Sequence, residues 1–450
     1  MIDSARPGDM VHIPAGTYRG TAIVTTPGIT LHGMGAVIDG DGAGTILVIR
    51  ADDVTVYGLR IRDTGIGPVG SPSAIWVEGD RARIEDVVVE DAYIGIAIRG
   101  ASDAIVEDST VSGLRDAAVT DAGHATGETS ATGSDASSGS TRGDGISLWN
   151  ARNTQIIGNQ IDAVRDGIYL SYGDGITLSG NHITGSRYAV HDMYALNLAL
   201  EGNRFERNLA GAVLMYGGPV RLEENAFLAS RSPSTGYGLL IKDADRITAV
   251  GNTIAGNRVG IHVENAGATM GGTAFLEGNT IAFNEIGVDF APSASETTFT
   301  RNNFVENTLQ VLTSDGERIP GVSWSQDGIG NYWSSYRGYD ADGDGVGDMA
   351  FTDAGVVESI VGRDPDLQVF ASGPGFRLLG SLENRWASAE PAISDPSPLA
   401  APFDPAIQPV AEPGSAASLV TALAAASLLA GAAAVARARR PRAIGRVRHG

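Results

Sequence analysis

The chain has 450 residues and a mass of 46.5 kDa, enough for two or three ordinary domains or for one long repeat array. Its 60 glycines are about twice the usual share of roughly 7%, while 19 prolines and 19% charged residues exclude collagen, coiled coil and wholesale disorder. The absence of cysteine excludes disulfides, zinc ribbons and cysteine nucleophiles, so any metal must be held by His, Met, Asp or Glu. The net charge of −21 argues against nucleic acid as a partner.

The start of the chain, MIDSARPGDMVHIPAGTY, has neither the basic start nor the apolar run of an export signal. It is strand-like from Met10 onward. Features near the C-terminal end predict an exported protein, so we interpret the missing signal as a start codon placed too far downstream. Residence in the cytoplasm is the alternative.

A short unit related to Gly-Asn-x-Ile/Phe repeats along the body, and a Gly-Ile-x-Leu unit accompanies it. The Asn of the Gly-Asn-x-Ile/Phe unit recurs at steps of 22, 22, 22, 27, 27 and 23 residues, at Asn159, Asn181, Asn203, Asn225, Asn252, Asn279 and Asn302. Such a period, rich in β-branched residues and without the frame of leucine-rich repeats, predicts an all-β fold. We expect a right-handed parallel β-helix of about eleven coils, about 22 residues each, over residues 1–310, with a mobile polar loop at 120–144.

We expect the repeated asparagines to lie at tight bends, where the left-handed backbone conformation is tolerated and side-chain amides can stack from coil to coil. This is a structural role. We therefore assign these asparagines no chemistry.

Alternation within the Gly-Ile-x-Leu strands separates inward from outward residues. The predicted inward pairs are Ile146/Leu148, Ile168/Leu170, Val190/Asp192, Ala212/Leu214 and Leu239/Ile241. One predicted outward column holds Ser147, Tyr169, His191, Val213, Leu240 and His262. The other holds Trp149, Ser171, Met193, Met215, Lys242 and Glu264.

An outward face with aromatic, His and Met side chains differs from the Thr, Ser, Lys and Glu of a solvated strand face. Met193 and Met215 lie one coil apart, with His191 on the strand of Met193, and thioether and imidazole groups suit Cu(I). The alternatives are that the face docks a protein partner or packs under a loop. The candidate residues for copper or for docking are His191, Met193, Met215, Trp149, Tyr169, Lys242 and His262.

Asp192 conflicts with this pattern, because it falls at an inward position. Either a local bulge turns it outward or it accepts a hydrogen bond at the end of a coil.

A second motif, GYDADGDGVGDMAF, resembles the front of an EF-hand calcium loop. Acids occupy positions 1, 3, 5 and 9 of the loop, which are Asp340, Asp342, Asp344 and Asp348. Gly345 is at position 6, and Val346 at position 7 offers a backbone carbonyl. Phe351 replaces the Glu of position 12, and Asp353 is a candidate substitute. We expect a structural calcium ion here, in a cap over residues 311–388.

Three segments follow the cap in the predicted organisation. Residues 389–415 are proline-rich and predict a semi-extended stalk. Residues 416–436 carry no charge over a length that spans about 30 Å as a helix, which predicts a membrane-spanning segment or a cleavable sorting signal. The Arg-rich residues 437–450 predict a cytoplasmic tail, with the body outside the membrane.

β-Helices also host enzymes that act on polysaccharides. Hydrolysis would need two carboxylates about 5 to 10 Å apart on one face, and the outward columns offer no such pair near His191. Tyr188, His191 and Asp192 could imitate an epimerase set, with Arg187 and Lys242 as the basic residues nearby. We therefore expect a binding protein, with a surface β-helix that binds or cleaves acidic polysaccharide as the alternative.

The sequence contains several long motifs, which are RYAVHDMYALN, GAVLMYGG, GYGLLIKDADRI, GNYWSSYRGYDADGDGVGD and the opening ARPGDMVHIPAGTYRG followed by GITLHGMGAVIDGDG. These motifs resemble the NosD family, β-helix proteins of nitrous oxide reductase maturation. The resemblance covers residues 5–365 and implies an extracytoplasmic protein that receives copper from a chaperone. It implies work with an ABC-type permease and ATPase in assembling the copper centres of nitrous oxide reductase. The sequence departs from the family in its loop, its C-terminal segment, its missing export signal and Asp192.

Overall fold

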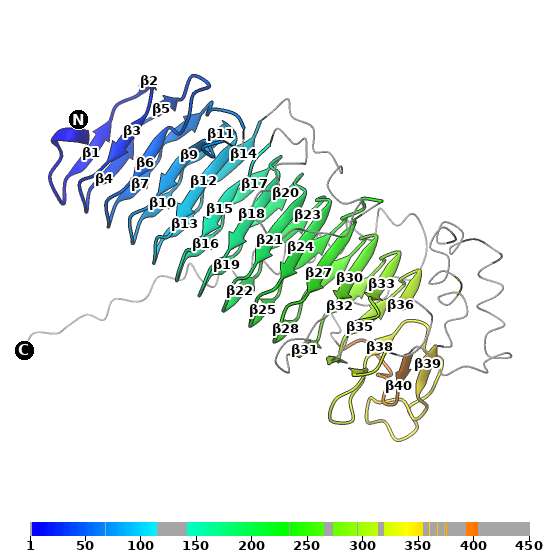
Figure 1. The fold of residues 1–450 in the computed structure, drawn as a ribbon. Coiled ribbons are helices and arrows are strands. Elements are labelled where there is room, and N and C mark those ends of the chain that lie inside the picture. The colour runs from blue at the N-terminus through cyan, green and yellow to red at the C-terminus, as the bar shows by residue number, and fades with distance from the viewer. Residues whose placement is uncertain are drawn as a thin grey trace, which may run out of the picture. The chain divides into compact units, whose positions relative to one another are not determined.

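A computed structural model shows the fold of the protein (Figure 1). It describes residues 2–353 except 68, 115–141, 234, 265–272, 295 and 314–318, together with residues 393–403 and the single positions 360, 367, 373 and 375. Most of the loop predicted at 120–144, most of the cap beyond 353 and the segments predicted as membrane span and tail lie outside the described residues. Within the described part, no helix is long and apolar enough to cross a bilayer.

The chain winds through three long parallel sheets, as predicted for a right-handed β-helix, after a short 3-10 helix η1 (Ile2–Ser4). Sheet A contains, in spatial order, β1 (Met10–Ile13), β4 (Thr30–Gly33), β7 (Thr55–Tyr57), β10 (Arg83–Glu85), β13 (Ile105–Glu107), β16 (Gln155–Ile157), β19 (Thr177–Ser179), β22 (Leu198–Glu201), β25 (Val220–Glu223), β28 (Ile247–Val250), β31 (Ala274–Glu277), β34 (Thr297–Thr300) and β37 (Val322–Ser323).

Sheet B forms the second wall of the solenoid. It contains β2 (Gly16–Arg19), β5 (Ala36–Asp39), β8 (Arg60–Arg62), β11 (Val88–Ala92), β14 (Thr110–Gly113), β17 (Gln160–Asp162), β20 (His182–Thr184), β23 (Arg204–Glu206), β26 (Ala226–Leu228), β29 (Thr253–Ala255), β32 (Thr280–Ala282), β35 (Asn303–Val305) and β38 (Tyr332–Trp333).

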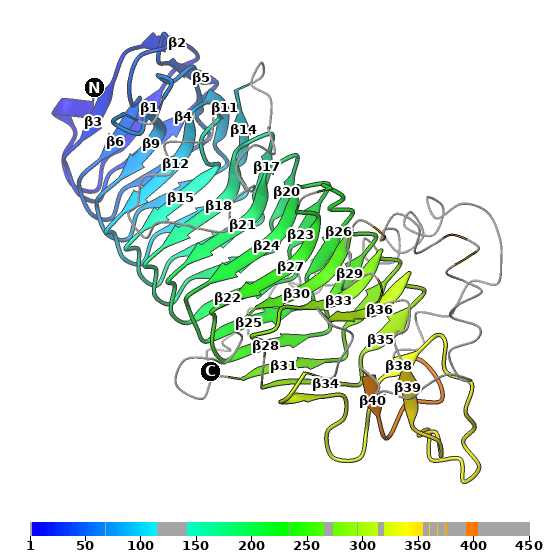
Figure 2. The ribbon, with the colours of Figure 1, turned by 45° about the vertical axis from the view of Figure 1, so that its right-hand side comes forward.

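Sheet C forms the third wall of the solenoid (Figure 2). It contains β3 (Ala22–Val24), β6 (Leu47–Ile49), β9 (Ser73–Val77), β12 (Ile94–Arg99), β15 (Ile146–Trp149), β18 (Asp166–Ser171), β21 (Tyr188–Met193), β24 (Ala210–Met215), β27 (Tyr237–Lys242), β30 (Val259–Glu264), β33 (Ile286–Phe290) and β36 (Leu309–Thr313). The three sheets make about 12 turns of about 23 residues, close to the predicted eleven coils of 22.

The end of the β-helix differs from the predicted organisation in two ways. β37 and β38 extend the solenoid past the expected boundary at residue 310. Residues 393–403, expected to lie in an unpacked stalk, return to the body, where β40 (Ile393–Asp395) pairs with β39 (Phe351–Asp353). The sequence analysis predicted a stalk because the segment is rich in proline, and it missed the strand in which Ile393 and Asp395 alternate as buried residues.

A ladder of buried asparagines joins the coils, as the sequence predicted. The side-chain oxygen of each Asn accepts a hydrogen bond from the backbone N–H of the preceding Asn in the ladder, for example Asn181 to Asn203 at 2.9 Å. Each amide nitrogen donates to the oxygen of the next and to a backbone carbonyl. The ladder passes through Asn331 and ends on the Asp395 carboxylate, 2.8 Å from the Asn331 nitrogen.

The expected backbone conformation at the ladder needs a correction. The asparagines themselves are not left-handed; the residue before each one is, such as Gly180 (φ 63°), Glu224 (φ 53°) and Arg301 (φ 55°). Glycine dominates this position because it adopts positive φ without a steric penalty. The asparagine then points its amide inward along the axis.

We predict that Asn203→Ala lowers the free energy of unfolding by about 2–4 kcal/mol. The substitution leaves the buried Asn181 N–H and the Leu178 carbonyl without their partners, and each unmade buried hydrogen bond costs about 1–3 kcal/mol. Urea unfolding followed by circular dichroism measures the change. Gln155→Ala, at an exposed position of β16, is the control and should change stability by less than about 0.5 kcal/mol.

Candidate functional site

The strand register confirms both predicted outward columns of sheet C. Tyr169 lies opposite His191, and His191 opposite Val213, on β18, β21 and β24. Met193 lies directly opposite Met215. We name Tyr169, His191, Met193 and Met215 the His-Met stripe. All five predicted inward pairs, including Asp192, are buried in the solenoid.

The His-Met stripe is outward but not open to solvent. The His191 residue is only 7% exposed, and Met193 and Met215 are half-buried. By contrast Trp149, in the same column as the methionines, is 48% exposed. His191 is therefore held in a fixed setting, while Trp149, whose register partners are Arg99 and Ser171, is open to solvent.

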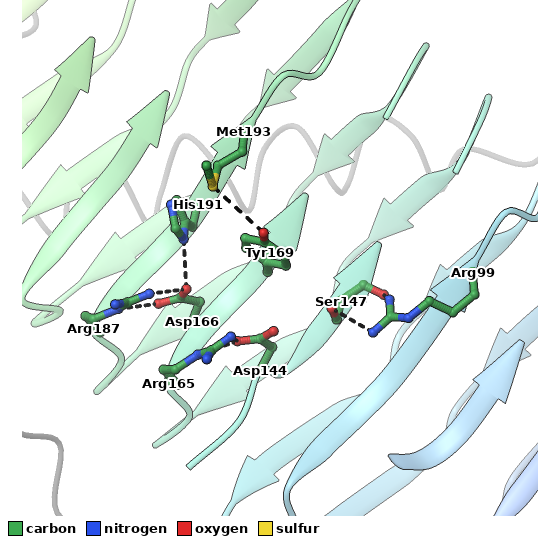
Figure 3. Close-up of polar contacts among 9 residues, drawn as sticks. All are labelled: Arg99, Asp144, Ser147, Arg165, Asp166, Tyr169, Arg187, His191 and Met193. Atoms are coloured by element: carbon green, nitrogen blue, oxygen red, sulfur yellow. Dashed lines mark hydrogen bonds and ion pairs between the residues drawn. The ribbon is translucent and has the colours of Figure 1, made fainter. Parts of the chain in front are cut away.

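A buried carboxylate fixes the orientation of His191 (Figure 3). Asp166, at the start of β18, is fully buried and lies 2.9 Å from Nδ1 of His191. Arg187 donates two hydrogen bonds to the same carboxylate, at 2.9 and 2.7 Å. Burial alone would raise the pKa of Asp166, but the charge of Arg187 and the bond to His191 outweigh it and hold the pKa well below its usual value.

A second ion pair lies one coil before the first. Arg165 contacts Asp144 at 2.8 and 3.0 Å, and the Asp144 charge is the main cause of a raised pKa for Arg165. Figure 3 shows the two Arg-Asp pairs side by side, below Tyr169, His191 and Met193. The two arginines compensate the charges of two buried carboxylates that would otherwise lie close together without a counter-charge.

Aromatic and sulfur groups complete the surroundings of His191. The Tyr169 ring lies 5.2 Å from the His191 ring, and the Tyr188 ring lies 5.1 Å from it edge-on. The Tyr169 hydroxyl is 3.8 Å from the Met193 sulfur. Burial raises the pKa of Tyr169, so this hydroxyl stays protonated at neutral pH.

The arrangement suits metal coordination by the other ring nitrogen of His191. An imidazole that is tied by one nitrogen to a carboxylate is fixed in tautomer and orientation, and its second nitrogen becomes a better metal ligand. Met193 lies two residues after His191 on β21, and Met215 lies directly opposite Met193 on β24, so both supply thioether sulfurs on the same face. Two soft sulfurs and an imidazole form a donor set that fits Cu(I).

The other predicted candidates lie further along sheet C. Lys242 forms an ion pair with Glu264 at 2.8 Å, and this bond raises the pKa of Lys242. His262 lies 2.8 Å from Asp289 through Nδ1, and its ring centroid is 5.1 Å from that of Tyr237, with the two rings tilted by 40°. The register thus separates His262 from the His-Met stripe and gives it a carboxylate partner of its own.

The structure decides between the two alternatives that the sequence left open for Asp192, a bulge or a hydrogen bond at the end of a coil. The register of β21 runs through Asp192 without a shift, between Leu170 and Leu214, so the bulge is excluded. Asp192 instead accepts a hydrogen bond at the end of the coil, from Ala195 N–H at 3.1 Å. Its second oxygen is buried and has no hydrogen-bond partner within the part of the chain that the structure describes. Burial therefore raises the pKa of Asp192 to about 8.

One expectation about carbohydrate chemistry was wrong. Tyr188, His191 and Asp192 do not form an outward-facing set, because Asp192 is fully buried at an inward position. Asp166, which the outward columns do not include, lies 2.9 Å from His191, and Asp144 pairs with Arg165 one coil earlier. The sequence analysis missed Asp166 because it precedes the alternating part of its strand; its signal is the Arg-Asp dipeptide at 165–166, in register with Arg187-Tyr188.

Three of the four acids in the predicted acidic loop lie close together. Carboxylate oxygens of Asp340, Asp342 and Asp344 lie within 4.8 Å of one another. Backbone N–H groups of Gly345 and Gly343 donate to Asp340, and the Gly345 bond in particular lowers its pKa. Asp348 accepts from Ala341, and Val346 donates to Asp344. Calcium binding by this loop stays a prediction.

The fold and the stripe define a parallel β-helix with a soft-ligand face, and comparison with known proteins places it further. Residues 123–338 match the family described as "Periplasmic copper-binding protein (NosD)". A "Probable ABC transporter binding protein NosD" of Pseudomonas aeruginosa is 32% identical over 398 residues, covering 86% of this chain and 87% of the relative. The protein of that name from Stutzerimonas stutzeri is 30% identical, with 86% coverage of each. The chain therefore belongs to the NosD family.

Solved structures share the fold. The A-module of the mannuronan C-5 epimerase AlgE6 of Azotobacter vinelandii has a TM-score of 0.52 at 16% identity, over 72% of this chain and 92% of the module. The catalytic unit of a GH87 alpha-1,3-glucanase of Streptomyces thermodiastaticus has a TM-score of 0.50 at 15% identity, over 75% and 66%. At such identities the likeness concerns the β-helix alone.

The raised pKa of Asp192 predicts a pH-dependent stability. The folded protein keeps this proton up to about pH 8, whereas an ordinary Asp releases it near 3.8. The folded state therefore binds more protons between these values, and the free energy of unfolding should fall as pH rises through this range, by up to about 5 kcal/mol at roughly 1.4 kcal/mol per unit. Urea unfolding at pH 5 and pH 8 measures the fall.

Asp192→Asn is the matched variant for this measurement, since it keeps an acceptor for Ala195 N–H and removes the titrating group. Its stability should depend less steeply on pH than that of the unmodified protein. Equal slopes in the two proteins would show that Asp192 is ionised in the fold.

Proposed function

We propose that this protein is an extracytoplasmic copper-handling subunit that works with an ABC transporter in the maturation of nitrous oxide reductase. The observation that carries the proposal is the register of sheet C, which brings His191, Met193 and Met215 together in a chain of the NosD family. Copper is the cargo in this proposal. The family description as periplasmic and copper-binding, and the ABC transporter in the names of the relatives, support it.

Each residue of the stripe has a distinct part. His191 offers Nε2 to the metal while Asp166 holds Nδ1, and Arg187 keeps Asp166 ionised. Met193 and Met215 offer sulfur, which favours Cu(I) over harder ions. Tyr169 contacts the Met193 sulfur and limits its motion. Trp149, Lys242 and His262 flank the stripe along sheet C and are proposed to contact the partner that delivers or receives copper.

The charge state of the acidic residues near His191 favours a binding function over catalysis on polysaccharides. Asp144 and Asp166 are tied to Arg165 and Arg187, and Asp166 is ionised. An acid that must give a proton to a glycosidic oxygen needs a raised pKa instead. Asp192 has a raised pKa, but it is fully buried at an inward position of β21 and does not face a glycan on the outer surface.

The proposal extends to partners and to place in the cell. We propose an ABC-type permease and ATPase, a copper chaperone and nitrous oxide reductase as partners, with the protein outside the cytoplasm. The apolar residues 416–436 remain the predicted membrane anchor. The acidic loop is proposed to hold a structural calcium ion beside the segment at 393–403, where Val346 pairs with Leu399.

A Cu(I) titration of the full chain, in competition with a chromophoric chelator, tests the stripe. His191→Ala and Met193→Ala each remove one proposed ligand, and each should weaken one equivalent of Cu(I) by at least about tenfold, which corresponds to about 1.4 kcal/mol. Thermal unfolding of the same samples checks that both variants fold.

His182→Ala is the control, because this imidazole is well exposed on sheet B, away from the stripe. It should leave the titration unchanged. Unaltered affinity in both stripe variants would sink the copper role of the stripe and leave it as a protein-docking face.

A further inference from the structure

Two histidines lie side by side at the other end of the β-helix, on a different sheet from the His-Met stripe. His12 of β1 and His32 of β4 are direct partners in the register of sheet A. Their ring centroids are 5.4 Å apart, at 61°. Tyr57 of β7 continues the column, 5.0 Å from His32. The His32 ring therefore lies between the His12 and Tyr57 rings. The His12 ring is on the first strand of sheet A, so it is at the end of the column.

Two exposed methionines flank this pair on the same face. Met10 lies two residues before His12 in β1, so strand alternation places both side chains outward. Met34 follows the end of β4 in a bend, two residues after His32, and its side chain is exposed. The backbone hydrogen bonds between the two segments run from Thr30 N–H to the Asp9 carbonyl as far as Met34 N–H to the Ile13 carbonyl, each at 3.0 Å.

The exposure of these methionines is unusual. Met10 is 57% exposed and Met34 is 56% exposed, although burying a Met side chain would gain about 1.5–3 kcal/mol. The whole chain has seven Met and seven His, and two of each meet here. A solvated strand face would carry Thr or charged residues instead. The grouping of His and Met therefore favours a binding site for a metal ion that prefers soft donor atoms.

The spacing allows all four side chains to reach one ion. Neighbouring strands are about 4.8 Å apart and the rise is about 3.3 Å per residue, so Met10 and His32 are diagonal neighbours about 8 Å apart at Cα. Met34 lies just past the end of β4, and its N–H is still bonded to the Ile13 carbonyl beside His12. A methionine has three rotatable bonds before its methyl group and adapts easily. Both sulfurs can swing toward the point between the two imidazoles.

We propose that Met10, His12, His32 and Met34 form a second, surface copper site that binds Cu(I) through two imidazoles and thioether sulfur. Imidazole and thioether together suit Cu(I), and the exposed setting allows a partner to give or take the ion directly. The site differs from the His-Met stripe, where His191 is almost closed off from solvent. The inference rests on the proposed function for the choice of copper, whereas its geometry is independent of the stripe.

The test counts Cu(I) equivalents bound to the full chain in chelator competition, using Cu(I) alone as the probe. The unmodified protein should bind two equivalents. The double variant His12→Ala/His32→Ala should lose one of them and keep the other, and Met10→Leu/Met34→Leu should weaken that same equivalent by at least about tenfold. These residues lie on the outer face of sheet A, so the variants should fold, and circular dichroism confirms it.

The outcomes separate the two sites. One equivalent that is lost in His12→Ala/His32→Ala but not in His191→Ala supports the surface site and contradicts the stripe. One equivalent that is lost only in His191→Ala overturns the surface site and leaves the proposed function standing. Two equivalents that survive in His12→Ala/His32→Ala, or no binding in the unmodified protein, also overturn the inference. His182→Ala again serves as the exposed-histidine control.

Discussion

The hydrogen bond from one ladder asparagine to the next is the constraint on which the rest of the structure depends. It joins each coil to the following one at 2.9–3.0 Å from Asn159 to Asn302, although the number of residues between neighbours changes from 22 to 27 and back to 23. The surplus residues leave as loops. A one-residue slip would turn the inward side chains of a strand outward, so the ladder keeps the register that the buried residues need.

The site follows from that register rather than from any local motif. No two of Asp166, His191 and Met215 lie closer than 24 residues in sequence, yet they lie on three successive strands of sheet C. Because coils repeat at strand spacing, a residue type at one position of the coil meets its counterpart in the next coil. The His-Met stripe, the Arg-Asp pairs and the His12-His32 pair all arise in this way.

Burial decides which of these groups are fixed in one charge state. Asp166 remains ionised inside the protein because Arg187 and His191 face it, whereas Asp192, with one backbone donor, takes up a proton. The two carboxyls belong to neighbouring strands and point to opposite sides of the same sheet. A buried charge is retained only where a partner compensates for the lost water.

Much of this could be predicted from the sequence, because the alternation of a strand and the step between asparagines are local patterns. They give the β-helix, the inward pairs and both outward columns. Asp166 could not be found this way, since it lies before the alternating residues and its partners come from the next coil. The return of residues 393–403 and the shielding of His191 likewise depend on contacts between distant segments, which no period in the sequence records.

The most direct test of the account is the position of copper in crystals of the Cu(I)-loaded protein, located by anomalous scattering at the copper edge. The account predicts a peak within bonding distance of His191 Nε2 and of a sulfur from Met193 or Met215. Copper bound elsewhere, with the His-Met stripe free of anomalous density, would contradict it.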